Sequence, residues 1–165
     1  MNIPFLLQAA ELLPVGSPAP VVPILDQNGK PFDLAAAYKK GMTLVYFYPK
    51  ADTPGCTAQA CSLRDDTGEL SKLGVQVIGV SKDSPEAQKK FQEKYQLPFT
   101  LLADDKRELG EAFGVGAMLG FSNRTSFLIK DGKIVWCSPK AQTKEHAKEV
   151  EEALAQLATT GSKKK

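Results

Sequence analysis

The chain has 165 residues and a mass of 17.8 kDa, with 42% hydrophobic and 24% charged residues, values that are typical of one globular domain with a substantial core. Its net charge of +2 is small and scattered, which argues against a nucleic-acid partner, and no apolar run approaches the length of a membrane span. Three cysteines are too few for a disulfide-stapled scaffold. Because the chain has a single histidine, His146, a structural zinc site is not expected.

The two ends of the chain are expected to lie outside the folded domain. We predict an N-terminal extension over residues 1–14, a single domain over 15–158 and a flexible lysine-rich tail over 159–165. The apolar patch at residues 3–7 is short and has no positive region before it, so it does not indicate a secretory signal. A cytoplasmic location is therefore the expectation, without a membrane partner.

The first half of the domain begins with a Pro- and Gly-rich segment in which 26–30 is typical of a β-hairpin turn. A short helix and a continuous apolar, β-prone run follow, and such a run predicts a strand that is covered on both faces. After a Pro-Gly turn a helical pattern continues to Gly74, which is expected to end the helix, and a second buried strand comes next. The expected ranges are 34–40 for the short helix, 43–48 for the first strand and 75–81 for the second.

In the second half, Ser84 and Pro85 are predicted to begin a charged helix. A short strand and a short helix follow, and then two strands flank an Asp-Gly hairpin turn before a last helix. This order predicts a largely parallel sheet with helices on both faces and antiparallel strands at one side, which is a three-layer α/β/α domain with a central mixed sheet. The expected ranges are 99–104, 107–113, 125–129, 133–137 and about 144–157.

The segment YFYPKADTPGCTAQACSLRDD, residues 46–66, carries the clearest chemical signal. Cys56 follows a central strand and a Pro-Gly turn, at the expected first turn of a helix, and open α/β sheets place their chemistry at that edge. The unpaired N–H groups of a helix start stabilise a thiolate, which is a nucleophile at neutral pH. Thr53 places a hydroxyl near the same turn, while Pro49 and Pro54 stiffen it. A buried core thiol is the alternative, but it fits poorly where the chain turns at the surface.

Cys61 permits two interpretations. Five helical residues separate two Cα atoms by about 8 to 9 Å, which exceeds the limit of about 7 Å for a disulfide. Either Cys61 is an inert core thiol, or the first turn of the helix unwinds so that Cys61 can reach Cys56. Cys137, beside Trp136, is expected to be a packing residue and remains an alternative partner.

The same segment resembles the active site of peroxiredoxins, specifically the bacterioferritin-comigratory or Q type. Pro49, Thr53 and Cys56 match the family's Pro, three residues, Thr, two residues, Cys pattern, and the resemblance extends from Val15 to about Leu157. Two positions depart from the family pattern, where a glutamate and an aromatic residue are common. These are Gln59 and Leu63.

The resemblance implies a thioredoxin-like fold and a peroxidase that needs no metal or organic cofactor. It implies that Cys56 attacks a hydroperoxide and becomes a sulfenic acid, and that Arg124 contacts the sulfur. It also implies that Cys61 is the resolving cysteine and that thioredoxin or a similar dithiol protein reduces the resulting disulfide. The backbone N–H of Cys56, the Thr53 hydroxyl and Arg124 are the expected donors toward the departing oxygen. A monomer is the expected state.

The residues also give expectations for two further parts of the sequence and permit two alternative functions of the reactive thiol. The Gly-rich residues 114–120 follow a helix and are expected to form a loop that flanks the peroxide pocket, while Asp104 and Asp105 are expected to be turn and cap residues. A thioredoxin-type oxidoreductase would usually have two residues between its cysteines, whereas this chain has four. A non-catalytic redox sensor or holdase would use the same thiol without turnover.

Overall fold

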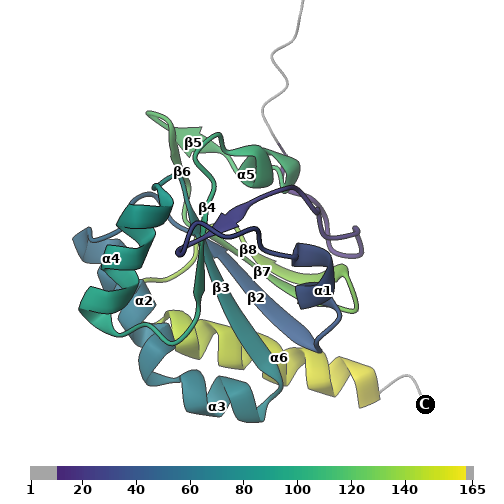
Figure 1. The fold of residues 1–165 in the computed structure, drawn as a ribbon. Helices are drawn as coiled ribbons and strands as arrows, with labels where there is room; N and C mark the ends of the chain where they lie inside the picture. The colour runs from purple at the N-terminus through teal and green to yellow at the C-terminus, as the bar shows by residue number, and fades with distance from the viewer. Residues whose placement is uncertain (1–10, 163–165) are drawn as a thin grey trace, which may run out of the picture.

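The computed structural model describes residues 11–162, in which a central mixed sheet lies between two layers of helices (Figure 1). The predicted three-layer α/β/α architecture is confirmed. The sheet has six strands in the order β1-β4-β3-β2-β7-β8, with β2, β3 and β4 parallel and the other pairs antiparallel. Its strands are β1 (Leu25–Asp26), β2 (Met42–Phe47), β3 (Val75–Ser81), β4 (Thr100–Ala103), β7 (Thr125–Lys130) and β8 (Lys133–Ser138).

The helices follow the predicted order, with two differences. The helix expected to continue to Gly74 is divided at Asp66, and the last helix runs to Ser162, through residues that the sequence analysis assigned to the tail. The three terminal lysines lie outside the described residues. The helices are α1 (Leu34–Tyr38), α2 (Pro54–Asp65), α3 (Thr67–Lys72), α4 (Pro85–Tyr95), α5 (Glu108–Ala112) and α6 (His146–Ser162).

The N-terminal hairpin is only partly a pair of strands. Asp26 N–H donates to the Lys30 carbonyl at 2.8 Å, and Phe32 N–H donates to the Ile24 carbonyl at 2.9 Å, so the turn forms where it was predicted. The returning side makes only an isolated bridge at Pro31, since proline has no N–H to give to a ladder. The hairpin therefore contributes the short edge strand β1, which pairs with β4.

Alternation along the central strands sorts side chains into two cores. Tyr46 on β2 and Tyr48 just after it face a cluster formed with α2, α3, α4 and α6, while Val45 and Phe47 on β2 face a cluster formed with α1 and α5. All four side chains are fully buried, which is the reason that this strand is apolar without interruption. Helices thus cover both faces, as Figure 1 shows.

The register of β2 against β7 determines which residues meet at the sheet edge. Phe47, the last residue of β2, is paired with Thr125, the first residue of β7. Because the two strands are antiparallel, the residue before β7, Arg124, emerges beside the loop that leaves β2. Residues that are far apart in the sequence therefore meet at the carboxyl end of the parallel strands.

A buried polar network joins α6 to the sheet and to α2. His146 is fully buried, with Nε2 lying 2.9 Å from Ser126 Oγ and Nδ1 lying 3.0 Å from a Glu149 carboxylate oxygen. The next residue along, Ala147, donates its N–H to Ser62 Oγ of α2 at 3.1 Å. The start of α6 is thus fixed to β7 on one side and to α2 on the other.

We predict opposite effects for two glycine-to-alanine substitutions. A Cβ at Gly79 would lie 2.8 Å from Leu101 Cδ2 and 2.9 Å from the Tyr46 ring, so Gly79→Ala should lower the free energy of unfolding by about 1 to 3 kcal/mol. A Cβ at Gly68, on α3, meets nothing within 4 Å, so Gly68→Ala should raise the free energy of unfolding by up to about 1 kcal/mol. Urea unfolding measures both, and equal effects would contradict the packing described for β3.

A second prediction concerns acid stability. Burial would raise the pKa of Glu149, but hydrogen bonds from His146 and from Gln142 N–H outweigh burial and lower the pKa below its ordinary value of 4.5. The unfolded chain then binds the proton more readily, so the stabilisation is complete above pH 4.5 and is lost as the pH falls through the lower folded value.

Glu149→Gln should therefore be about 1 to 2 kcal/mol less stable at pH 7 and should lose less stability than the unmodified protein as the pH falls below about 4.5. Thermal unfolding over a pH series measures this. Glu152→Gln, at an exposed position of the same helix, is the control. If both variants kept the slope of the unmodified protein, the carboxylate of Glu149 would have no such role.

Candidate active site

The thiol of Cys56 lies in the first turn of α2. Thr53 is the N-cap residue, Pro54 opens the helix, and the first helical hydrogen bond runs from Thr57 N–H to the Thr53 carbonyl at 2.8 Å. The Thr53 side chain makes no capping hydrogen bond, so it leaves the N–H groups of this turn uncapped. Cys56 is only 2% exposed, which differs from the surface turn that the sequence analysis expected.

Arg124 reaches this sulfur from the start of β7. Its Nη2 donates to Cys56 Sγ at 3.4 Å, and its Nη1 donates to the Gln59 Oε1 at 2.7 Å. Gly55 leaves room for the guanidinium, because a Cβ there would lie 3.0 Å from Nη2. The predicted meeting of Arg124 and Cys56 is thus present in the structure.

A cavity of about 390 Å³ gives access to the site. Pro49, Thr53, Cys56 and Arg124 line it, so the structure brings together the predicted site residues other than Cys61. The opposite wall comes from the hairpin of β5 (Ala117–Met118) and β6 (Phe121–Ser122), which lies in the Gly-rich loop that was predicted to flank the pocket. The apolar side chains of this wall are Met118, Leu119 and Phe121, and the first two are 73% and 91% exposed.

Two cations hold the hairpin wall in place. Arg107 Nη2 donates to the Val115 carbonyl at 2.6 Å, and Arg107 Nε donates to Ser122 Oγ at 3.2 Å. The Lys82 ammonium lies over the Phe121 ring, 5.2 Å from its centroid. The apolar side of the cavity is therefore tied to α5 and to the end of β3.

The loop between β2 and α2 is held by α4. Asp52 has a left-handed backbone conformation (φ +58°), and its carboxylate accepts from Lys94 Nζ at 2.8 Å and from the Tyr95 hydroxyl at 2.8 Å. The hydrogen bond from Lys94 lowers the pKa of Asp52 below its ordinary value. Ala51 N–H donates to an Asp83 carboxylate oxygen at 2.8 Å, so a second carboxylate fixes the same loop.

The other two thiols occupy different surroundings. Cys61 is partly buried and lies in the same continuous helix as Cys56, so the two thiols cannot bond while α2 keeps its helical form. Cys137 is half-buried on β8 and packs against the second core, where burial raises its pKa to about 11. A thiol with so high a pKa is a poor nucleophile at neutral pH, which agrees with the expected packing role.

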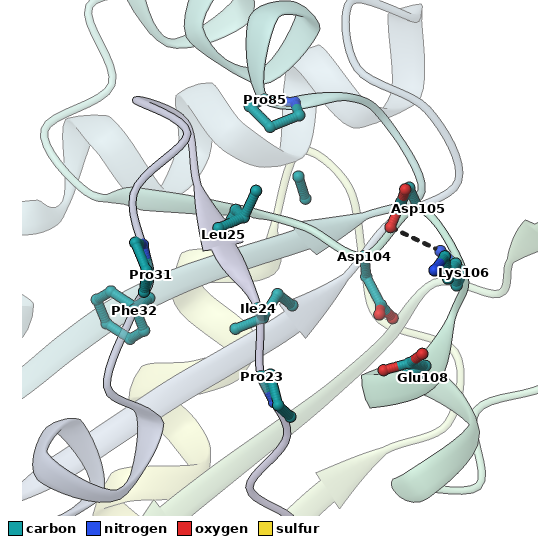
Figure 2. A pocket seen from close by; sticks show the side chains of 11 residues that line it. Pro23, Ile24, Leu25, Pro31, Phe32, Pro85, Asp104, Asp105, Lys106 and Glu108 are labelled. Atoms are coloured by element: carbon teal, nitrogen blue, oxygen red, sulfur yellow. Dashed lines mark hydrogen bonds between the residues drawn. The ribbon is translucent and has the colours of Figure 1, made fainter.

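A second cavity, of about 370 Å³, lies between the N-terminal hairpin, α4 and α5 (Figure 2). Figure 2 shows Leu25, Pro31 and Phe32 on one side and a group of acidic residues on the other. Asp104 accepts from the N–H groups of Leu109 and Gly110 at 3.0 and 2.8 Å, so it caps α5 as predicted. None of the three cysteines lines this cavity.

The described part of the chain has neither a cluster of metal-ligating side chains nor a helix that could span a membrane. Residues 11–162 contain no group of three or more His, Cys, Asp and Glu side chains that could hold a metal ion. No helix within the same range is both long and apolar enough to cross a membrane.

Several residues that support the site were not predicted from the sequence. Gln59 was noted only as a departure from the family pattern, and its contact with Arg124 was not predicted. Nothing local identifies Asp52, because its partners lie more than forty residues away in the sequence, on α4. Arg107 and Lys82 were also not predicted, although the loop that they hold was recognised.

Comparisons with known proteins agree with this geometry. The family model described as AhpC/TSA matches residues 15–137, and the chain belongs to this family. Peroxiredoxin Bcp of Escherichia coli K12 is 44% identical over 142 residues, which cover 81% of this chain and 90% of that protein. Peroxiredoxin Bcp of Bacillus subtilis 168 is 36% identical over 151 residues, which cover 87% and 96%. The predicted resemblance to the bacterioferritin-comigratory or Q type of peroxiredoxin is confirmed, and with it the class of thiol peroxidase.

Solved structures lead to the same conclusion. Peroxidoxin BcpB from Mycobacterium tuberculosis superposes with a TM-score of 0.78 at 32% identity, over 88% of this chain and 96% of that one. The bacterioferritin comigratory protein of Xanthomonas campestris, described for its alkyl peroxide reduction activity, gives 0.75 at 30% identity, over 83% and 92%. The predicted thioredoxin-like fold is therefore confirmed.

The close approach of Gly55 to Arg124 generates a prediction for the site. Gly55→Ala should displace the guanidinium and slow alkylation of Cys56 by about tenfold, which corresponds to about 1.4 kcal/mol, while leaving the free energy of unfolding unchanged or slightly raised. Iodoacetamide labelling in a Cys61→Ser, Cys137→Ser background measures the rate. Gly68→Ala is the matched control, and equal labelling rates for the two alanine variants would contradict the prediction.

Proposed function

We propose that this peroxiredoxin reduces hydrogen peroxide and organic hydroperoxides at Cys56, with Cys61 as the resolving cysteine. The observation that carries the proposal is the 3.4 Å contact between Arg124 Nη2 and the Cys56 sulfur, at the uncapped start of α2 and on the wall of an open cavity. A guanidinium and helix N–H groups both favour a thiolate at this place.

The first step follows from this arrangement. The Cys56 thiolate attacks the terminal oxygen of a hydroperoxide, a sulfur–oxygen bond forms, and the oxygen–oxygen bond breaks. The departing alkoxide or hydroxide takes a proton and leaves as alcohol or water, so Cys56 becomes a sulfenic acid. Negative charge moves from sulfur to the departing oxygen, and Arg124 can follow it because its planar fork offers several donors.

We propose for Thr53 a different role from the one expected from the sequence. Its hydroxyl donates to the Lys50 carbonyl at 2.7 Å, so its proton is already used and its oxygen offers acceptor lone pairs to the cavity. We propose that Thr53 accepts a hydrogen bond from the hydroperoxide O–H, whereas the sequence analysis counted it among the donors. Pro49, on the same wall, helps to shape the cavity and to limit the entry of water.

The cavity rim favours organic hydroperoxides alongside hydrogen peroxide. Met118, Leu119 and Phe121 offer exposed apolar surface beside the sulfur, where the organic part of a substrate can be removed from water. The Xanthomonas campestris relative is described as reducing alkyl peroxides, which supports the same substrate class here.

Formation of a disulfide between Cys56 and Cys61 requires a change in the conformation of α2. Cys56 and Cys61 both lie in α2, so we propose that its N-terminal half unwinds after oxidation and that the Cys61 thiol then attacks the sulfenic acid, releasing water and forming a disulfide. A dithiol protein such as thioredoxin would return both thiols by exchange. We propose a cytoplasmic monomer that works without a metal or organic cofactor.

The test is peptide mass spectrometry after one equivalent of cumene hydroperoxide. The unmodified protein should form a Cys56–Cys61 bridge, and Cys61→Ser should stop at a Cys56 sulfenic acid. Cys56→Ser should lose hydroperoxide consumption by a factor of at least about 10³, because the nucleophile itself is removed. A Cys56–Cys137 bridge in the unmodified protein would overturn the role of Cys61.

Turnover separates the enzyme from a redox sensor. With thioredoxin and its reductase supplied, the unmodified protein should consume many equivalents of hydroperoxide per chain. Cys137→Ser is the matched control, because it removes a thiol that lies outside the proposed cycle, and it should keep the full rate. Oxidation that ends after one equivalent would contradict the peroxidase cycle and favour the sensor.

A further inference from the structure

We infer that Gln59 is a positioning residue, which aims Arg124 at the Cys56 sulfur without neutralising the guanidinium. Gln59 is fully buried on α2, one helical turn after Cys56, and its Oε1 accepts from Arg124 Nη1 at 2.7 Å. The other end of the same guanidinium donates to the sulfur at 3.4 Å. The inference rests on the proposed function, since it assigns a role within the same site.

Within residues 11–162, no carboxylate forms an ion pair with Arg124. None of the ion pairs among the described residues involves this guanidinium, whose only side-chain hydrogen bonds run to Gln59 and to Cys56. A neutral amide fixes the direction of the fork and takes none of the positive charge. The electrostatic attraction therefore remains available for the thiolate, and it is screened little because the residue Cys56 is only 2% exposed.

The second amide group of Gln59 gives an independent reason to look for a function. Its Nε2 is buried and has no hydrogen-bond partner, and an unpaired buried donor costs free energy. A carboxylate of the same shape would remove that unpaired donor and would make a stronger, charge-assisted bond to Arg124. It would also share the guanidinium charge and place a negative charge beside the sulfur. The Gln59 amide is therefore less stabilising than a carboxylate would be, but it leaves the positive charge of Arg124 available to Cys56.

The test compares two substitutions of similar size at Gln59, only one of which adds a charge. In a Cys61→Ser, Cys137→Ser background, where Cys56 is the only thiol, iodoacetamide labelling is followed from pH 4 to pH 10. Gln59→Glu should move the labelling profile about one pH unit upward and lower the rate of reaction with hydroperoxide at neutral pH about tenfold. Gln59→Met, which loses the hydrogen bond but adds no charge, should slow the reaction with hydroperoxide while moving the profile by less than half as much.

Two controls separate this role from a purely structural one. Gln156→Glu adds the same charge at an exposed position of α6 and should leave the profile in place. Arg124→Gln should move the profile at least as far as Gln59→Glu, and together with Gln59→Met it keeps the inference testable if the glutamate variant does not fold.

The inference is overturned if Gln59→Glu keeps the original profile, or if Gln59→Glu and Gln59→Met move it equally. It is also overturned if Gln156→Glu moves the profile as far as Gln59→Glu does. Labelling does not need peroxide, so these outcomes are independent of the proposed function. The proposed function itself would fail if the background protein, with Gln59 intact, did not consume one equivalent of hydroperoxide.

Discussion

The contact between a guanidinium and a buried sulfur is the interaction on which the proposed chemistry of this protein depends, and the sheet creates it. Arg124 can reach Cys56 only because β7 runs antiparallel to β2 with Phe47 opposite Thr125. A shift of one residue in this register would turn the following side chains to the opposite face and would remove the cation from the thiol. The two apolar cores that fix the register therefore also hold Arg124 beside Cys56.

The surroundings of the thiol combine a rigid side with an apolar side. On the rigid side, Asp52 accepts hydrogen bonds from α4, while Gln59 and Gly55 shape the space around the guanidinium. On the apolar side, Met118 and Leu119 stand out from a hairpin that Arg107 ties down. The Cys56 thiol is thus kept nearly out of water and yet borders a cavity that could admit the small organic substrate proposed for it. Burial strengthens every electrostatic interaction at this place, so few groups are sufficient.

Much of this could be predicted from the sequence, and most of the remainder depends on contacts between residues far apart in the chain. The apolar run of β2, the Asp-Gly turn before β8 and the Pro-Gly turn before Cys56 are local signals, so the order of elements and the place of the thiol follow from them. The contact of Arg124 with the sulfur was predicted from the family resemblance alone. The register of β2 against β7 gives its physical explanation. Partners such as Gln59 are joined across long stretches of chain, and local patterns carry no information about them. The break of the long helix at Asp66 was likewise missed, because apolar spacing continues across it.

The hydrogen bond from Ala147 N–H to Ser62 Oγ bears on how large the redox change of this protein can be. Ser62 directly follows Cys61, so α2 is fastened to α6 where the segment between the two thiols ends, and the next residue, Leu63, is fully buried. Fraying that starts at Pro54 therefore meets a fixed point after about two helical turns. The reduced and oxidised chains would then share the same overall fold and differ only in the N-terminal part of α2. A reductant would therefore have to recognise a local change in the backbone and not a new overall shape.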